Sequence, residues 1–254
     1  AYMLLQAQAG TDPHDPFSMA PITDLDSPLE QADLGSIRAM ITPDLGSAAM
    51  SHAYSSIFAD RTSHFQHHFA AAIDASPDFT DGDNCFEVLR GVNFVAAHGG
   101  RVRDHRDSLS PNVVDNVDRG LAYSLADVAE AHLQQSRIAR AWLDLFEDID
   151  VVICPAASST PFPHDQWSVS EIDGETMETY MRWLGITYLP TMALACGIAL
   201  PCGLDQAGMP FGIQVLSAPG NDRLVAEVAK ALESVLQCHD ATRRPLPDLD
   251  SLRG

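Results

Sequence analysis

The sequence predicts an α/β fold, and three features lead to this prediction. A long amphipathic helix over 125–147 is followed at once by the uninterrupted apolar run 151–154, which is typical of a strand buried on both faces of a sheet. Two further apolar runs, 197–202 and 211–216, indicate strands joined by a turn. A second amphipathic helix begins at Asp222, which we expect to cap it. Helices packed on buried strands build an α/β architecture.

Length and composition fit one compact domain. The chain has 254 residues, 46% of them hydrophobic and 20% charged, which is typical of a globular protein with one substantial core. We expect a single domain over 1–238, followed by a polar tail over 239–254 that is rich in Pro, Asp and Arg.

The net charge argues against two classes of partner, and the cysteine content indicates a cellular location. The formal net charge of −20 repels phosphate backbones and anionic membranes, so neither nucleic acid nor a membrane is an expected partner. No apolar run approaches the roughly 20 residues that span a bilayer. An odd number of cysteines without a C-x-x-C pair favours reduced thiols and a cytoplasmic location; they are Cys85, Cys154, Cys196, Cys202 and Cys238.

The first half of the chain alternates loops with short regular elements. Residues 1–10 have an apolar stretch without the basic leader of a secretory signal, and we expect them to form the end of a helix. The Asp-, Pro- and Ser-rich segment 10–35 predicts a surface loop, which leads into a strand over 36–42. Apolar residues at helical spacing then predict helices over 47–73 and 83–97.

Capping signals mark the next helices. Ser110 followed by Pro111 is a helix-start signal. Ser124 and Asp127 form a capping-box pattern that opens the long helix. We expect this helix to bury one apolar face, made of Leu125, Val128, Ala129, Leu133, Ala139, Leu143 and Phe146. Residues 177–189 predict one more helix.

Two groups of side chains could form a catalytic or a metal site, but both are also typical of an exposed surface. Ser158 and Ser159 precede His164 and Asp165, as in a Ser/His/Asp hydrolase, but the G-x-S-x-G turn that presents such a nucleophile is absent and the segment is typical of a surface loop. His64, His67 and His68 lie one helical turn apart, with Asp60 before them, and this spacing suits a transition metal. Adjacent histidines on a helix are more often a solvated face, so we expect no metal.

Several segments resemble the amidase signature family. The most specific is 187–233, TYLPTMALACGIALPCGLDQAGMPFGIQVLSAPGNDRLVAEVAKALE, which is similar to the closing segment of that family. The resemblance runs back through DVVICPAASSTPFP at 150–163, PDFTDGDNCFEVLRGVNF at 77–94, IRAMITPDLG at 37–46 and LLQAQAGTDPHDP at 4–16. The fold that the resemblance implies is a mixed β-sheet flanked by helices, the C-terminal part of the amidase-signature fold.

The catalytic residues of that family have no counterpart here. The family hydrolyses amide bonds with a Ser–Ser–Lys triad, carried by a lysine and a Gly/Ser-rich segment in the first half of the chain. The one lysine of this sequence, Lys230, lies near Glu227 and Glu233 on the last helix, where a charged surface position is expected. We therefore expect a fragment that begins just after the catalytic core, with no catalytic residue of its own. Residues 194–197 read Leu-Ala-Cys-Gly where the family commonly has G-x-P-A, which leaves the subfamily open.

The resemblance places the segment after Cys154 at a strand end that faces the substrate. We expect a largely apolar wall around a small-molecule amide, to which Ser158, Ser159, Phe162, Trp167, Tyr188 and Thr191 contribute. Neither a metal nor an organic cofactor is implied. The expected partners are the missing N-terminal half and, in a possible homodimer, a second copy.

The function that the resemblance implies is hydrolysis of a carboxylic amide to an acid and ammonia or an amine. This chain alone is then expected to be inactive. Two alternatives stay open: a non-catalytic remnant or subunit that binds a partner chain, and a protein similar to the amidotransferase subunit that amidates misacylated tRNA. A lysine and a Gly/Ser-rich segment encoded upstream of Ala1 would separate the first alternative from the amidase.

Overall fold

The structure is a computed structural model that describes residues 1–21, 24–246 and 249. Most of the far end of the predicted tail, residues 247, 248 and 250–254, lies outside the described residues. The helices are α1 (Tyr2–Gln8), α2 (His52–Ser63), α3 (Gly82–His105), α4 (Pro111–Ala122), α5 (Leu125–Leu145), α6 (Gly185–Met192) and α7 (Asp222–Leu236). Single 3₁₀ turns lie at Leu34–Ser36, Gln66–His68, Arg106–Ser108 and Arg182–Leu184.

A five-stranded mixed sheet forms the centre of the fold, which confirms the predicted class. Its strands are β1 (Arg38–Ile41), β2 (Ala71–Asp74), β3 (Val151–Pro155), β6 (Cys196–Leu204) and β7 (Pro210–Ser217), in the order β2-β1-β3-β7-β6. β1 is parallel to both β2 and β3, whereas β7 is antiparallel to β3 and to β6. A separate two-stranded ribbon consists of β4 (Glu171–Ile172) and β5 (Glu175–Thr176).

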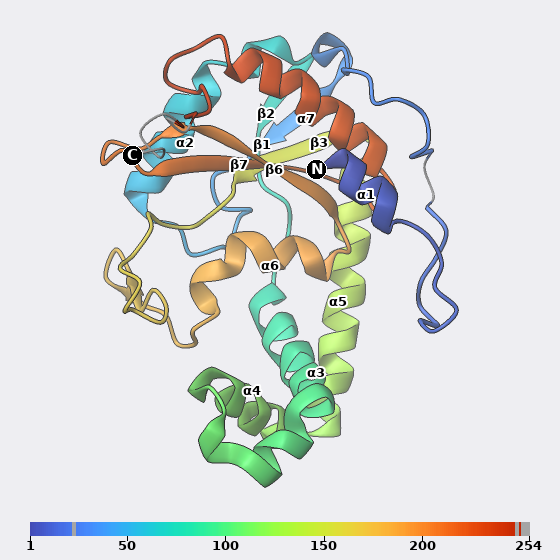
Figure 1. The fold of residues 1–254 in the computed structure, drawn as a ribbon, viewed down its shortest axis with the longest axis vertical. Helices are drawn as coiled ribbons and strands as arrows, with labels where there is room; N and C mark the ends of the chain where they lie inside the picture. Colours follow the sequence, from blue (N-terminus) through green and yellow to red (C-terminus); the bar gives the residue numbers. More distant parts are fainter. Residues whose placement is uncertain (22–23, 247–248, 250–254) are drawn as a thin grey trace.

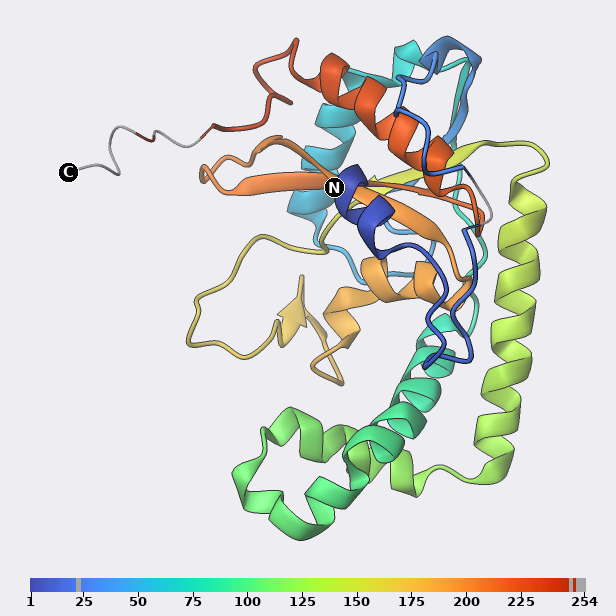
Figure 2. The same cartoon turned by 45° about the vertical axis from the view of Figure 1, so that its right-hand side comes forward.

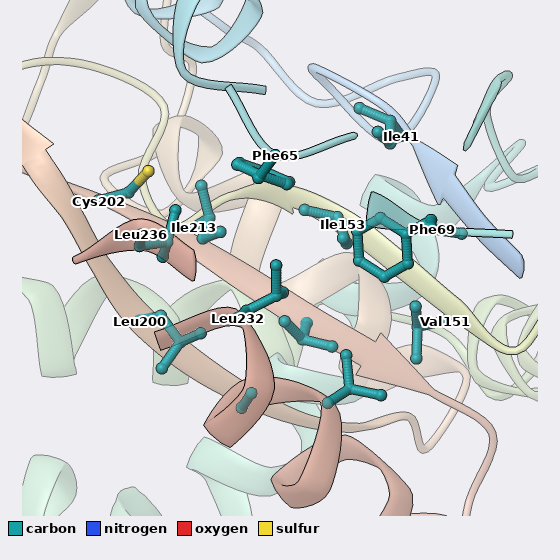
Figure 3. Packing of buried hydrophobic residues seen from close by; sticks show 14 of the residues in the cluster. Ile41, Phe65, Phe69, Val151, Ile153, Leu200, Cys202, Ile213, Leu232 and Leu236 are labelled. Carbon is teal, nitrogen blue, oxygen red and sulfur yellow. The ribbon is translucent and has the colours of Figure 1, made fainter. Parts of the chain in front are cut away.

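Helices cover both faces of the sheet (Figure 1). On one face, α2 and α7 enclose a core to which Ala39, Ile41, Val151 and Ile153 contribute from the strands, together with Phe65, Phe69, Ile213 and Leu232 (Figure 3). On the other face, α3, α5 and α6 pack over Met40, Val152 and Cys154. Side chains alternate between the two cores along β1 and β3, because successive strand residues point to opposite faces.

α3, α4 and α5 form a helical arm that extends away from the sheet (Figures 1 and 2). α3 and α4 cross at Gly91 and Gly120, where a Cβ built on Gly120 would lie 2.3 Å from the carbonyl oxygen of Gly91. Only glycine allows the backbones to approach so closely. Within the described residues, no helix combines the length and apolarity that a membrane crossing requires.

The sequence prediction was wrong for one strand. Residues 47–73 were expected to be one helix, but α2 ends at Ser63 and the chain turns through Gln66–His68 into β2. β2 has only four residues and lies at the sheet edge, so three of its residues are exposed. Its short sequence, Ala-Ala-Ile-Asp, therefore lacks the apolar signal of a central strand.

The inward face of α5 also differs from the prediction. The helix and its capping box at Ser124 and Asp127 are confirmed. However, the side chains it buries are Ala131, Gln134, Ile138 and Trp142, whereas Leu125, Leu133 and Leu143 are exposed. The polar side chain of Gln134 is tolerated in this buried position because its Oε1 accepts a hydrogen bond from Asn84 Nδ2 at 3.0 Å. Ala131 is buried because it packs against α3, where the Cys85 thiol donates to its carbonyl oxygen at 3.3 Å.

Two smaller predictions need correction. The helix expected over 177–189 begins only at Gly185, because Glu175–Thr176 pairs with β4 and a 3₁₀ turn follows. Asp222 is the first residue of α7 and not its cap; Asn221 occupies the cap position, without a side-chain hydrogen bond to the helix.

An ion pair joins the start of β1 to the start of β3. Asp150 Oδ2 accepts from the backbone N–H of Arg38 at 2.7 Å and from its Nε at 3.2 Å, and Asp150 Oδ1 accepts from its Nη2 at 3.0 Å. These hydrogen bonds hold the pKa of the Asp150 carboxyl below its usual range, against the opposing effect of burial. A carboxyl with a depressed folded pKa stabilises the fold above its unfolded pKa of about 4, and this contribution is lost as pH falls through the folded pKa.

We therefore expect Asp150→Asn to lower the free energy of unfolding at pH 7 and to weaken its dependence on pH below about 4. Urea unfolding at a series of pH values measures both effects. Asp165→Asn, in an exposed loop, is the matched control and should leave the pH dependence as it is. The same pH dependence for Asp150→Asn and the unaltered chain would contradict this role of the pair.

Candidate functional site

The three parallel strands end at the same edge of the sheet, and hydroxyl side chains gather there. Thr42 directly follows β1, and its Oγ1 lies 2.8 Å from the Oγ of Ser76, which comes shortly after β2. Ser158 follows β3 and is fully buried. Open α/β sheets bind ligands outside the carboxyl ends of their strands, so this edge is the candidate site.

The loop from β1 to α2 crosses this edge in a constrained conformation. Leu45 is buried and has φ +54°, in the left-handed region that side chains seldom adopt. Its backbone N–H donates to Thr42 Oγ1 at 3.0 Å, which holds the turn. At the end of the loop, Ser51 caps α2 with its side chain, and its N–H donates to the carbonyl oxygen of Ser158 at 2.9 Å. The loop thus links the ends of β1 and β3.

Gln214 connects the end of β3 to α6. Its Nε2 donates to the carbonyl oxygens of Pro155 at 2.9 Å and Ile186 at 3.1 Å. The adjacent Cys154 is fully buried, and burial raises the pKa of its thiol far above the usual range. Cys154 is therefore a packing residue without nucleophilic character, because the thiolate is the reactive form.

A cleft of about 570 Å³ opens beside this edge, between α2 and β2. Its apolar lining includes Ile41 and Phe58, and its polar lining includes His52 and Asp74. His52 Nδ1 lies 2.9 Å from Oδ2 of Asp173 in the β4–β5 turn, and the His52 side chain is otherwise exposed at the cleft. This volume falls in the range of small-molecule sites.

Two of the predicted wall residues lie next to each other at the end of β3. Ser158 is buried, and its Oγ has no hydrogen-bond partner among the described residues. Ser159 is half-buried, and its Oγ donates only to the carbonyl oxygen of Thr160 at 3.4 Å. A buried hydroxyl without a partner costs about 1–3 kcal/mol, which makes Ser158 a candidate contact residue of this site.

The predicted aromatic residues of the following loop separate. Phe162 is half-buried and packs edge-on against Trp183, with ring centroids 5.4 Å apart. Both rings border a small cluster formed by Val169, Ile172 and Met177 around the β4–β5 ribbon. Trp167 is 74% exposed and does not join this cluster.

The two predicted residues of α6 belong to different surroundings. Tyr188 is buried and stacks on Phe86 of α3 at a centroid distance of 4.0 Å. Its hydroxyl donates to Asp83, which also pairs with Arg182, and burial raises the pKa of Tyr188 to about 12. Thr191 is exposed, and its hydroxyl donates back to the carbonyl oxygen of Tyr188 at 2.6 Å. Tyr188 therefore anchors α6 to α3.

The alternative sites of the sequence analysis are not assembled in the described part of the chain. Among the described residues, Ser158 Oγ has no hydrogen-bond partner and Ser159 Oγ donates to the carbonyl oxygen of Thr160, so neither serine pairs with a histidine. The His67 and His68 rings lie against each other, and His64 lies against His239. Over residues 1–21, 24–246 and 249, no group of three or more His, Cys, Asp or Glu is placed to hold a metal. Lys230 is exposed and donates to the carbonyl oxygen of Leu29.

Sequence reasoning missed Thr42, Ser51, Ser76 and Gln214 at this edge. Gln214 carries a signal, because it is the only polar residue in the apolar run 211–216. Ser51 also carries one, since it stands at the cap position of a helix. Thr42 and Ser76 become partners only through the parallel pairing of β1 and β2, which the sequence analysis did not predict.

Comparison with known proteins finds similarity to amidases. Residues 103–226 match the family model described as Amidase. An acylamidase of Rhodococcus erythropolis is 23% identical over 239 residues, which are 92% of this chain and 49% of that protein. One subunit of a glutamyl-tRNA(Gln) amidotransferase of Cyanothece sp. is 34% identical over 95 residues, which are 37% of this chain and 18% of that protein.

Solved structures share the fold. A bacterial aryl acylamidase of the amidase signature family superposes with a TM-score of 0.71 at 16% identity, over 93% of this chain and 52% of that chain. The present chain thus spans about half, or less, of the length of the proteins to which it is similar.

Proposed function

We propose, from the premise that residues 103–226 belong to the amidase signature family, that this chain forms part of an amidase. The reaction would be hydrolysis of a carboxylic amide to an acid and ammonia or an amine. The observation that carries the proposal is the hydroxyl-rich strand edge at Thr42, Ser76 and Ser158, in a fold that amidases share. The chain would supply one wall of the substrate site and much of the sheet.

The catalytic Ser–Ser–Lys residues would come from outside these 254 residues. Such a mechanism needs a neutral lysine, which burial favours, to activate the attacking serine through a second serine. Lys230 is exposed at the surface and is the one lysine of the chain, so it does not suit this role. The unpartnered Ser158 hydroxyl is consistent with a polar group supplied by another segment.

The unpaired edges of the sheet support the proposal that a separate catalytic half docks on this chain. β2 and β6 are the outer strands, and within the described residues each pairs with one neighbour only. An unpaired strand edge is a template for further pairing. We propose that the catalytic half of the amidase continues the sheet at such an edge and completes the site.

The test is the activity of the purified chain towards a panel of aryl and aliphatic amides. We expect no turnover above background, because the chain lacks a buried lysine. Ser158→Ala and Ser159→Ala are the controls. Turnover that either substitution abolishes would replace this proposal by a self-contained serine hydrolase.

A component of a tRNA-dependent amidotransferase is the second candidate, because the Cyanothece relative has the higher identity over its shorter match. Such a component would need an ammonia-supplying route and partner subunits. A non-catalytic subunit that binds a partner chain is the third. The chain can be assayed together with such partner subunits. Amidation of glutamyl-tRNA(Gln) without hydrolysis of simple amides would favour the amidotransferase.

Location and cofactors remain predictions. The five cysteines are all free in the structure, which is compatible with the proposed cytoplasmic location. The proposed reaction uses neither a metal nor an organic cofactor.

A further inference from the structure

The cleft between α2 and β2 adjoins the hydroxyl edge directly. Ile41 and Pro43, which both line it, lie on either side of Thr42 in the chain. Asp74, the last residue of β2, also lines the cleft and precedes Ser76 by two residues. Thr42 and Ser76 are the two residues whose hydroxyl oxygens lie 2.8 Å apart. A molecule bound at this edge can therefore extend into the cleft.

The strand register places Asp74 on the cleft side of the sheet. β1 and β2 are parallel, and Ile41 is the partner of Asp74. Paired residues of neighbouring strands point to the same face, and Ile41 belongs to the core on the α2 face. Ala72, two residues before Asp74, points to this face as well and lines the cleft. The carboxylate thus lies beside an apolar strip that Ile41 and Ala72 form.

The Asp74 carboxylate has no counter-charge in the described part of the chain. It is exposed, and it forms neither an ion pair nor a hydrogen bond there. None of the described residues that line the cleft is a lysine or an arginine. The formal charge of −20 on the whole chain adds to the negative potential in the cleft. Electrostatics therefore favour a cationic ligand in the cleft over an anionic one.

Hydroxyl groups of α2 offer hydrogen-bond acceptors to the cleft. Ser56 Oγ donates its proton to the carbonyl oxygen of His52 at 2.8 Å. Thr62 Oγ1 donates to the carbonyl oxygen of Ala59 at 3.1 Å. Both hydroxyl side chains line the cleft. Because each hydroxyl proton is used within the helix, the lone pairs are what these groups offer to a ligand. An ammonium group has three donors and no acceptor, so it matches them.

We propose that the cleft binds the ammonium group of an amide substrate that carries a positive charge. The inference rests on the proposed function and names the class of amide. The amide bond lies at the hydroxyl edge, an aliphatic part lies over Ile41 and Ala72, and the ammonium group lies at Asp74. The cleft of about 570 Å³ is large enough for an aliphatic chain of several carbons.

Titration of the purified chain with hexylammonium, hexanol and hexanoate, followed by NMR, tests the ligand charge without any need for catalysis. The three ligands share an apolar chain and differ in charge. We expect hexylammonium to bind most tightly and hexanoate most weakly. Hexylammonium should bind roughly fivefold more tightly than hexanol at low salt, as expected for an exposed ion pair. This difference should decrease at high salt, because salt screens exposed charges.

Substitutions of Asp74 assign the preference to one side chain. Asp74→Asn should remove the preference for hexylammonium over hexanol, and Asp74→Lys should make hexanoate the tightest ligand. Asp165→Asn, which removes an exposed carboxylate from the loop after β3, is the matched control and should leave the order unchanged. Asp74 is exposed on an edge strand, so we expect its variants to stay folded, and thermal unfolding checks this.

Two binding results would overturn the inference: equal affinities of the unaltered chain for the three ligands, and the same order of affinities in Asp74→Asn. Steady-state kinetics in the presence of the catalytic half extend the test to 6-aminohexanamide and hexanamide. We expect a kcat/KM roughly fivefold higher for the charged amide, and loss of this preference in Asp74→Asn. Equal hydrolysis of both amides contradicts the inference but not the proposed function. Hydrolysis of neither contradicts the proposed function, and the binding order then still decides the ligand class of the cleft.

Discussion

Replacing Trp142 by alanine is expected to destabilise the fold by about 3–5 kcal/mol, since a fully buried aromatic side chain leaves a cavity. Trp142 is 1% exposed and packs between Phe79, with centroids 5.6 Å apart, and Phe146, with centroids 5.3 Å apart. Its Nε1 also donates to the carbonyl oxygen of Ser217 at 3.4 Å, which ties α5 to the end of β7. The melting temperature should fall by roughly 10 °C or more.

Trp167→Ala is the matched control for this substitution. Trp167 is 74% exposed, so its removal should change the free energy of unfolding by about 0.5 kcal/mol or less. Differential scanning calorimetry measures both variants. Equal melting temperatures for the two would show that Trp142 does not anchor α5 to the sheet.

In the complete enzyme, Trp167→Ala should alter substrate preference instead of stability. We propose that Trp167, on the loop after Ser159 and Phe162, contacts bulky acyl or amine groups of the amide. Removing about 1–3 kcal/mol of apolar contact lowers kcat/KM for aromatic amides by roughly 10-fold or more, whereas amides the size of acetamide lose much less.

Trp183→Ala provides the comparison. Trp183, in the 3₁₀ turn Arg182–Leu184, packs on Phe162, so its loss should lower stability and affect large and small amides alike. Steady-state kinetics with aryl amides and acetamide separate the two outcomes. An equal loss for both substrate classes with Trp167→Ala would make it a packing residue.

Three strands of the sheet could be predicted from their largely apolar sequence. The runs 151–154, 197–202 and 211–216 all lie within strands, because continuous apolar sequence flanked by turn residues has few other structures. β2 was missed because an edge strand of four residues needs little apolar sequence. Its identity as a strand comes from parallel pairing with β1, a contact between distant residues.

The helical spacing of apolar residues does not determine which side of α5 faces the sheet. Both of its sides carry apolar residues at helical spacing, so the sequence pattern does not choose which side faces the sheet. The fit of Trp142 and Ile138 against α3 and the strands decides it. The same limit applies to the site, where Ser158 was identified from its place after a strand, but its contact with Ser51 depends on tertiary structure.

The most direct test of the proposed function is amide hydrolysis by the chain in the presence of the catalytic half of the enzyme. That half would be a polypeptide with the lysine and the Gly/Ser-rich segment that the proposed mechanism requires. The account predicts turnover only when both parts are present, and its loss when the lysine of the added part is replaced by alanine. Turnover by this chain alone, or a folded complex of both parts without turnover, would contradict it.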